Sequence, residues 1–329
     1  MKTLHDVGIL GTGSYVPDRV LSNADLERMV DTSDEWIVTR TGITERRIAA
    51  PEQATSDLAY EAGRRALADA GVDPKEIDVV IVATVTPDHL VPATSCIVQH
   101  RLGCVNAGAF DLEAACSGFV TSMVNARALI GCGVAKKILV IGAETMSRIV
   151  NYEDRGSCII FGDAAGAMVL GADAPRGRIL DGTFGADGSG AYFMVVPAVG
   201  SRKPASEEVV RNREHLLFMK GGETFKFAVQ KFRDLVAEQC ERVGVTTADI
   251  KLVVPHQVNL RIVESALKKV DIEMDRIFMN IDRYGNSSAA SVPLAFDEAR
   301  RQGRFGPGDL VSLVAFGAGL TWSSALLRW

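Results

Sequence analysis

The sequence predicts an α/β fold built from two related halves. Short runs of β-branched residues alternate with longer segments whose apolar residues recur at helical spacing, as in strands joined by crossover helices. Residues 71–77, which read GVDPKEI, recur as GVTTADI at residues 244–250, an offset of 173 residues. A repeat of about half the chain indicates a duplicated unit, since a solenoid has many short repeats. We therefore expect halves spanning residues 1–173 and 174–329.

The clearest strands are three apolar runs at residues 78–82, 137–141 and 310–314. Helical spacing predicts helices over residues 56–70 and 226–243, and each runs into a glycine that can close a helix. The least regular stretch is 187–215, which contains proline, glycine and many charged residues. A long loop of this kind is more often a functional excursion or a partner contact than a passive linker.

Composition excludes several classes of protein. The 329 residues are 47% apolar and 23% charged, as in a globular protein, and the formal charge of −5 gives no basic field for nucleic acid. The longest strong apolar run, Val79–Val85, is far shorter than the roughly 20 residues that span a bilayer, so we expect neither a signal peptide nor a membrane anchor. The six cysteines form no CxxC pair, which favours reduced thiols in a cytoplasmic protein.

Cys116 is the first candidate for chemistry, because it stands where a strand ends and a helix begins. A thiol at a helix N-terminus faces free backbone N–H groups and the positive end of the helix dipole, and both favour the thiolate. Its neighbours in Ala114–Gly118 are small and leave room for a substrate. The alternative is that Cys116 is a small buried hydrophobic residue.

His256 and Asn286 also follow apolar segments of the second half. His256 ends the run Leu252–Pro255, at the carboxyl end of a strand, where α/β sheets gather active groups. No other histidine stands at metal-ligand spacing, so we expect no zinc site. Asn286 lies between a strand and a helix, and the alternative to a catalytic role is that it only caps the N-terminus of that helix. The small residues of Phe316–Gly319 offer backbone N–H groups to an oxyanion, or form only a tight turn.

Two nucleotide motifs are incomplete. Gly11–Gly13 follows an apolar run, and Asp31 stands about 20 residues further on, as in a dinucleotide site. Val16 occupies the place of the third glycine and Pro17 follows it, so we expect no nicotinamide site. The phosphate-binding pattern GxxxxGK[ST] is absent from the sequence.

Ordered motifs along essentially the whole chain resemble the thiolase-like condensing enzymes, and within them the β-ketoacyl-[acyl-carrier-protein] synthase III family. The resemblance implies a five-layered αβαβα architecture of two pseudo-symmetric halves, and a homodimer. The motifs lie at residues 11–17, 31–43, 110–119, 161–167, 256–259, 285–288 and 316–322.

The resemblance implies a role for each candidate. Cys116 would take an acyl group from acyl-CoA as a thioester, and His256 and Asn286 would stabilise the enolate formed when malonyl-[acyl-carrier protein] loses carbon dioxide. The backbone N–H groups of Cys116 and Ala318 would hold the oxyanion. Phe316 resembles the family's aromatic gate beside the malonyl carboxylate. No metal or organic cofactor is implied, because coenzyme A enters as part of the substrate.

The same resemblance implies two binding surfaces. Trp36, Arg40 and Arg155 match positions that hold the adenine and phosphates of coenzyme A. An acidic carrier protein would dock on a patch of basic residues on and near the helix after His256. The alternative is that this patch is an ordinary solvated helix face. These residues are Lys226, Arg261, Lys268 and Lys269.

The sequence departs from the family pattern near the acyl pocket. Val91 stands where many members carry a bulky aromatic that lines this pocket from across the dimer, so we expect a longer or branched acyl primer to be tolerated. Met146 stands near the same pocket and either fills that space or flexes away from it. Ala318 replaces a common glycine, which keeps the backbone donor but restricts its conformation.

Other functions remain open at this point. A related enzyme can use the same three residues for a polyketide or alkylquinolone starter condensation, or for acyl transfer alone. Dependence on malonyl-carrier protein rather than malonyl-CoA distinguishes these. A catalytically silent acyl-carrier-binding protein on the same fold is disfavoured by the intact Cys116, His256 and Asn286. A Cys-His hydrolase is disfavoured because no residue is seen to position a water.

Overall fold

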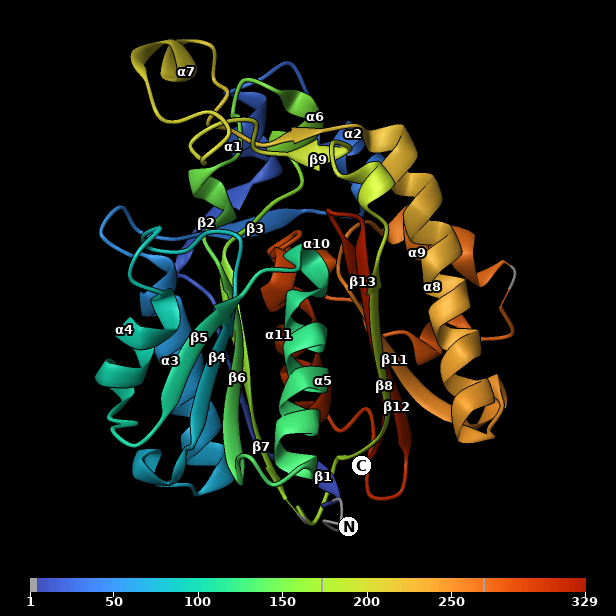
Figure 1. The fold of residues 1–329 in the computed structure, drawn as a ribbon. Helices are drawn as coiled ribbons and strands as arrows, with labels where there is room; N and C mark the ends of the chain where they lie inside the picture. The colour runs from blue at the N-terminus through green and yellow to red at the C-terminus, as the bar shows by residue number, and fades with distance from the viewer. Residues whose placement is uncertain (1–4, 173, 269) are drawn as a thin grey trace.

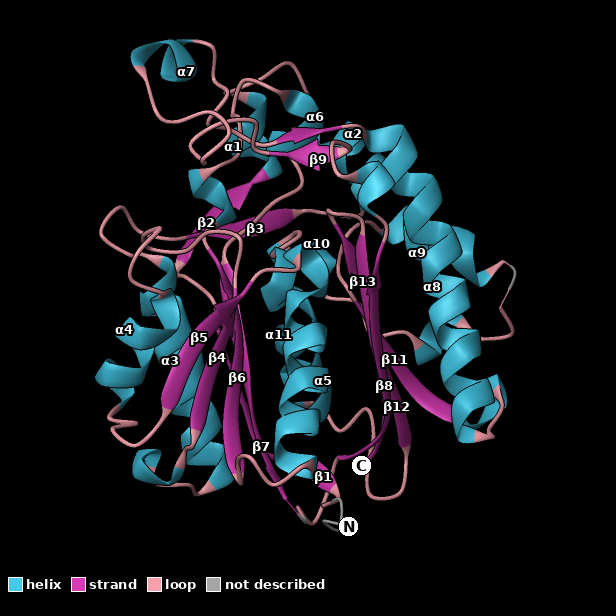
Figure 2. Cartoon of the chain, viewed as in Figure 1, coloured by secondary structure: helices cyan, strands magenta, loops and turns pink. Residues whose placement is uncertain are grey.

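The computed structural model describes residues 5–172, 174–268 and 270–329 and contains two large β-sheets separated and flanked by helices (Figure 1). Helices α3 (Thr55–Ala70) and α4 (Thr94–Leu102) cover the outer face of the first sheet. Helix α8 (Gly221–Val243) covers the outer face of the second sheet, and α9 (Leu260–Leu267) packs beside it. Two helices fill the space between the sheets (Figure 2). The expected αβαβα architecture is confirmed.

The first sheet has five strands and is mixed. In spatial order, adjacent strands among the first three are antiparallel, and the last three strands are parallel. The strand order is β1 (Val7–Tyr15), β7 (Ala164–Ala172), β6 (Lys137–Glu144), β4 (Val79–Ala83) and β5 (Gly108–Leu112).

The second sheet has four strands, of which only the first pair is parallel. Every strand of the first sheet ends by residue 172, and every strand of the second begins at residue 178 or later. Residue 173, the expected boundary, lies outside the described residues, so the division at this position stays a prediction. The strand order is β11 (Ile250–Pro255), β12 (Leu310–Gly317), β13 (Thr321–Arg328) and β8 (Arg178–Ala186).

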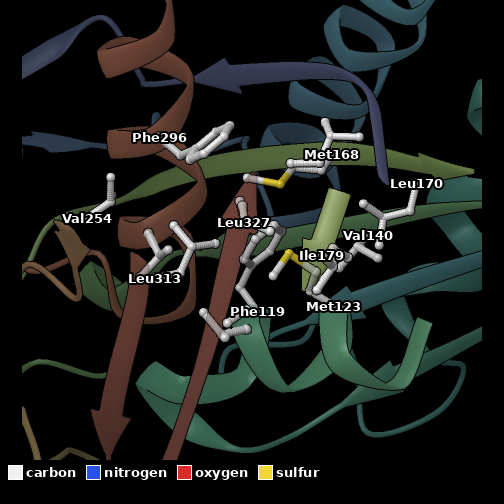
Figure 3. Packing of buried hydrophobic residues seen from close by; sticks show 14 of the residues in the cluster. Phe119, Met123, Val140, Met168, Leu170, Ile179, Val254, Phe296, Leu313 and Leu327 are labelled. Atoms are coloured by element: carbon white, nitrogen blue, oxygen red, sulfur yellow. The ribbon is translucent and has the colours of Figure 1, made fainter. Parts of the chain in front are cut away.

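The two helices between the sheets are α5 (Gly118–Gly131) and α11 (Ser291–Arg301). Phe119 of α5 and Phe296 of α11 are fully buried in one cluster with residues from both sheets (Figure 3). Each helix is preceded by a short 3₁₀ turn, Ala115–Ser117 or Ser288–Ala290, and these two turns contact each other. The shared core therefore holds both helix N-termini together.

Local signals identified the long elements well. Strands β6 and β12 contain the expected runs 137–141 and 310–314 and extend beyond them, whereas β4 is shifted by one residue from the expected 78–82 and spans Val79–Ala83. Helix α3 ends at Gly71, which has φ 63°, and α8 ends at Gly244, which has φ 74°. Both glycines adopt the left-handed conformation that other residues rarely take. Helix α8 begins at Gly221, five residues before the expected start.

The segment 187–215 has more secondary structure than the sequence predicts. It contains a 3₁₀ turn at Gly188–Gly190, strand β9 (Met194–Val195) and helix α7 (Glu207–Arg211). Strand β9 pairs with β10 (Phe218–Met219), beside α2 and α6 at one end of the molecule (Figure 1). The remaining elements at this end and nearby are β2 (Arg19–Ser22), α1 (Asn23–Glu27), α2 (Asp34–Thr41), β3 (Glu45–Ile48), α6 (Arg155–Cys158) and α10 (Ile281–Tyr284).

None of the described helices combines the length and apolar character that crossing a bilayer requires.

Candidate active site

Cys116, His256 and Asn286 line one cavity of about 700 Å³. They come from the first sheet's β5–α5 connection, the end of β11, and the segment before α11. The same cavity is lined by Trp36, Arg40, Arg155, Arg261, Phe316, Met194 and Met219. Residues far apart in sequence, including both halves of the chain, therefore form a single site.

The backbone around Cys116 is tightly constrained. Ala115 has φ 46°, a left-handed conformation that costs free energy for a residue other than glycine. The turn places Cys116 two residues before α5 begins. Gly317 at the end of β12 packs directly against it, because a Cβ there would stand 2.7 Å from the Cys116 backbone nitrogen. Only glycine permits this approach, which fixes Cys116 against the end of the second sheet.

The Cys116 side chain is 5% exposed, and burial raises the pKa of its thiol to about 12. Hydrogen bonds from the Ser288 side chain and from the Cys116 backbone N–H act in the opposite direction. The nearby carboxylates of Glu144 and Glu113 raise the pKa further. The helix N-terminus alone thus does not make Cys116 a thiolate here, because desolvation of the charged form outweighs it.

His256 is held as a neutral hydrogen-bond donor. Its Nδ1 lies 2.7 Å from Ser291 Oγ, which also accepts a hydrogen bond from the Gln257 backbone N–H at 3.4 Å. We assign the Ser291 hydroxyl as the donor to Nδ1, which leaves the ring proton on Nε2. Burial lowers the pKa of His256 to about 3. The edge of the ring meets Phe316, with the ring centroids 6.0 Å apart.

The Asn286 amide is oriented by the residue two positions later. The Ser288 backbone N–H donates to Asn286 Oδ1 at 2.8 Å, which leaves the Nδ2 group as the part of the amide available to a ligand. The Asn286 backbone N–H donates to the Ile160 carbonyl at 2.9 Å, and its carbonyl accepts from Gly162 at 3.1 Å. Asn286 is not a helix N-cap, since Ser287 holds that position for the 3₁₀ turn and Ala290 for α11, and it lines the cavity.

Phe316 and Ala318 differ in their placement. Phe316 lines the cavity, whereas Ala318 is not among the lining residues, although its neighbour Gly317 is. Thr321 Oγ1 donates to the Ala318 carbonyl at 2.9 Å and so ties down the turn that follows β12. The role of Ala318 as an oxyanion donor stays a prediction.

Three aromatic and basic side chains from α2 and α6 meet at the cavity. The Arg40 guanidinium carbon lies 4.6 Å from the centroid of the Trp36 ring, and that of Arg155 lies 5.1 Å from it. Arg155 also donates to the Asp31 carbonyl at 2.9 Å. A planar aromatic group that stacks on Trp36 would share the ring with two guanidinium groups, which are also suited to binding phosphate.

Two of the expected docking residues lie on helices that pack together, Lys226 on α8 and Arg261 on α9. Arg261 lines the cavity from the first turn of α9, and Lys226 is exposed on α8. Lys268 is exposed and caps the C-terminus of α9, one residue beyond the helix. Lys269 lies outside the described residues.

Neither residue expected at the acyl pocket lines this cavity in the single chain. Val91 is 86% exposed, as is its neighbour Leu90. Met146 is buried and packs in a cluster with Val150 and Phe161. Phe161 lines the cavity, and Met146 does not.

Sequence reasoning missed Glu144, which is fully buried at the end of β6. Burial raises the pKa of its carboxyl to about 7. The available signal was a single acidic residue at the end of an apolar strand, the same position that singled out His256. Among the described residues, no group of His, Cys, Asp and Glu side chains is arranged to hold a metal ion.

Comparison with known proteins identifies the family. The family model described as "3-Oxoacyl-[acyl-carrier-protein (ACP)] synthase III" matches residues 110–188, and the model of its C-terminal part matches residues 240–329. A protein of Caldanaerobacter subterraneus named β-ketoacyl-[acyl-carrier-protein] synthase III is 53% identical over 98% of this chain and 97% of its own. A protein of that name from Clostridioides difficile is 48% identical over 98% of each chain.

Solved structures agree with this result. The 3-oxoacyl-[acyl-carrier-protein] synthase III of Aquifex aeolicus is 43% identical, with a TM-score of 0.91, over 98% of this chain and all of that one. The priming β-ketosynthase of the R1128 polyketide pathway is 35% identical, with a TM-score of 0.91, over all of this chain and 97% of that one. The chain therefore belongs to the β-ketoacyl-[acyl-carrier-protein] synthase III family and is a condensing enzyme of the acyltransferase class.

Proposed function

We propose that this protein initiates fatty-acid synthesis by joining an acyl group from acyl-CoA to malonyl-acyl-carrier protein. The observation that carries the proposal is the single cavity shared by Cys116, His256 and Asn286, with Trp36 and two arginines among its lining residues. A nucleophile, two neutral hydrogen-bond donors and a site suited to an adenine nucleotide are the parts that this reaction needs.

In the first half-reaction the Cys116 sulfur attacks the acyl-CoA carbonyl. The backbone N–H groups of Cys116 and Ala318 hold the oxyanion, the bond to the coenzyme A sulfur breaks, and an acyl-Cys116 thioester remains. Trp36, Arg40 and Arg155 hold the nucleotide end of the substrate during this step. Binding energy at the remote nucleotide orients the thioester beside the sulfur.

In the second half-reaction malonyl-carrier protein loses carbon dioxide, and negative charge gathers on its thioester oxygen. His256 Nε2–H and Asn286 Nδ2–H donate to this enolate, and Phe316 disfavours the charged carboxylate. The enolate carbon attacks acyl-Cys116, and the cysteine sulfur leaves to give β-ketoacyl-carrier protein. Neutral donors meet the developing charge at each step, so the proposed reaction needs no metal or organic cofactor.

Reconstitution tests this proposal. Purified protein, acyl-CoA and malonyl-acyl-carrier protein should give β-ketoacyl-carrier protein, carbon dioxide and coenzyme A in equal amounts. Equal activity with malonyl-CoA would favour the alternative hypothesis of a polyketide or alkylquinolone starter condensation. Free fatty acid as the sole product would indicate a hydrolase, and no turnover with any acyl donor would indicate a silent scaffold. Fatty-acid synthesis is favoured over a polyketide role because this chain is 53% identical to the Caldanaerobacter subterraneus synthase III and 35% identical to the R1128 priming β-ketosynthase.

Carrier docking gives the first prediction. Arg261→Glu should raise the KM for malonyl-carrier protein by roughly tenfold, because one reversed charge opposes an acidic partner and typically changes binding by about 1 to 2 kcal/mol. Steady-state kinetics at low and high salt measure this effect, which salt should diminish. The matched control is Arg211→Glu on α7, away from α8 and α9. An unchanged KM for Arg261→Glu would place the docking surface elsewhere.

We also propose that the enzyme is a homodimer that works in the cytoplasm. Strand β5 is the last strand of the first sheet, and the outward-facing Phe110 on it is 41% exposed. The nearby Leu90 and Val91 are strongly exposed apolar residues. Pairing of β5 with the β5 of a second copy would cover this apolar surface and remove it from water. All six cysteines are free, which fits a reducing compartment.

The size of Val91 gives the second prediction. Val91→Phe should exclude longer acyl-CoA chains and still accept acetyl-CoA. The larger side chain would fill part of the acyl pocket that Val91 lines from across the proposed dimer. Intact mass after exposure to a panel of acyl-CoAs measures the heaviest group accepted. Val134→Phe is the control, since Val134 is also a strongly exposed valine, at 71%, but follows the C-terminal end of α5. An identical acyl range in both variants would contradict a role for Val91.

A further inference from the structure

Glu144 is a buried carboxylate that the two half-reactions leave unused. Every hydrogen bond that the described residues give it comes from a neutral group. The hydroxyls of Thr84 and Thr86 donate to Oε2 at 3.1 and 2.7 Å, and the Val85 backbone N–H donates to the same oxygen at 3.1 Å. The donors make an ionised carboxylate tenable without a cation, although its desolvation is costly.

Ser288 joins this carboxylate to the nucleophile. Its hydroxyl donates to Glu144 Oε1 at 2.9 Å. Ser288 has φ 48°, so its backbone is held in a left-handed conformation that serine rarely adopts. Its turn packs on the turn that carries Cys116, and its side chain lowers the pKa of the Cys116 thiol. The Ser288 hydroxyl is thus hydrogen-bonded to the carboxylate and acts on the sulfur.

The thiol needs a proton acceptor when it attacks acyl-CoA, because burial keeps it protonated. His256 does not fill this role well, since its Nδ1 receives the Ser291 hydroxyl and its Nε2 already carries the ring proton. Glu113 also acts on the Cys116 thiol, but it is not hydrogen-bonded to Ser288. Its carboxylate accepts a hydrogen bond from the Ala115 backbone N–H at 3.2 Å instead.

We propose that Glu144 is the proton acceptor for Cys116, acting through the Ser288 hydroxyl. As the sulfur bonds to the acyl carbon, the thiol proton passes to Ser288 Oγ while the Ser288 proton passes to Glu144 Oε1. The acyl bond to coenzyme A breaks, and its thiolate leaves and takes a proton from solvent. When condensation later expels the Cys116 sulfur, the same path returns a proton to it. This inference rests on the proposed function.

A distinctive dependence on pH follows. Burial raises the pKa of Glu144 to about 7, and the carboxyl accepts a proton only when ionised. The groups that contact it from the segment after β4 and from the turn before α11 are hydroxyls and backbone amides, and Cys116 is the titratable neighbour. The acylation rate should therefore rise as pH increases through about 7 and level off above it.

The test measures the rate of Cys116 acylation by acetyl-CoA in single-turnover mass spectrometry across this pH range. Glu144→Gln should lower the rate at neutral pH by roughly 100-fold and remove the plateau, so that the rate keeps rising with the thiolate fraction. Ser288→Ala should behave in the same way with Glu144 intact. Glu113→Gln, the matched control, removes a second nearby carboxylate and should keep the plateau.

A second readout separates this role from a structural one. Decarboxylation of malonyl-carrier protein in a Cys116→Ala background needs His256 and Asn286 but no thiol proton transfer, so adding Glu144→Gln should leave that rate within about twofold. An unchanged acylation profile in Glu144→Gln and Ser288→Ala would overturn the proposal, as would equal losses in both half-reactions. Failure of the unmodified enzyme to acylate would instead refute the proposed function.

Discussion

Cys116→Ser is expected to abolish the acyl adduct formed with acyl-CoA and to lower overall turnover by on the order of 10⁴-fold or more. A serine hydroxyl is a much weaker nucleophile than a thiol at the same position, so it should attack the acyl-CoA thioester far more slowly. Intact mass after exposure to acyl-CoA, followed by peptide mapping, measures the adduct directly.

The matched control is Cys104→Ser. Cys104 is also fully buried, and burial raises the pKa of its thiol to about 11, but it does not line the cavity. The two cysteines therefore differ in position rather than in their exposure. An adduct that persists in Cys116→Ser, or that is lost in Cys104→Ser, would contradict the assignment of the nucleophile.

His256→Ala is expected to slow decarboxylation of malonyl-carrier protein by roughly 10² to 10³-fold, because it removes one donor to the enolate. Acylation of Cys116 should persist, since the enolate forms only in the second half-reaction. His256→Gln should lose less because its amide can still donate. His100→Ala, at an exposed position on α4, should change neither half-reaction.

The low pKa of His256 adds a pH criterion to this prediction. Burial lowers the pKa to about 3, so the ring stays neutral well below the value near 6.5 at which an ordinary histidine titrates. Decarboxylation should thus show no loss attributable to this ring as pH falls from 8 to about 5. Stopped-flow measurement of carbon dioxide release in the Cys116→Ala background provides the profile. A fall in rate centred near pH 6.5 and absent from His256→Gln would contradict a neutral donor.

The sequence predicted the main parts of the site because they follow from local pattern. Cys116 and His256 each follow a strand that runs parallel to its neighbour, β5 in the first sheet and β11 in the second, and α/β sheets gather active groups at such carboxyl ends. The helix ends at Gly71 and Gly244 were predictable for a similar reason, since glycine tolerates the left-handed conformation there.

Features that depend on burial were not predictable in this way. The helix N-terminus beside Cys116 suggested a thiolate, but the pKa is governed by packing around the sulfur, which no local pattern reveals. Glu144 and Ser288 are 144 residues apart in sequence and meet only through the packing of β6 on the turn before α11. Met146 was expected near the acyl pocket, and its burial in a cluster with Val150 and Phe161 likewise depends on tertiary packing.

The most direct test of the account is a chase of isolated acyl-enzyme. The protein is acylated with carbon-13-labelled acetyl-CoA, freed of coenzyme A and mixed with malonyl-acyl-carrier protein. We expect the label to leave Cys116 and to appear in the keto carbonyl of β-ketoacyl-carrier protein, with one carbon dioxide released for each Cys116 cleared. Label recovered as free acetate, or retained on Cys116 while the product forms, would contradict a condensation through this cysteine.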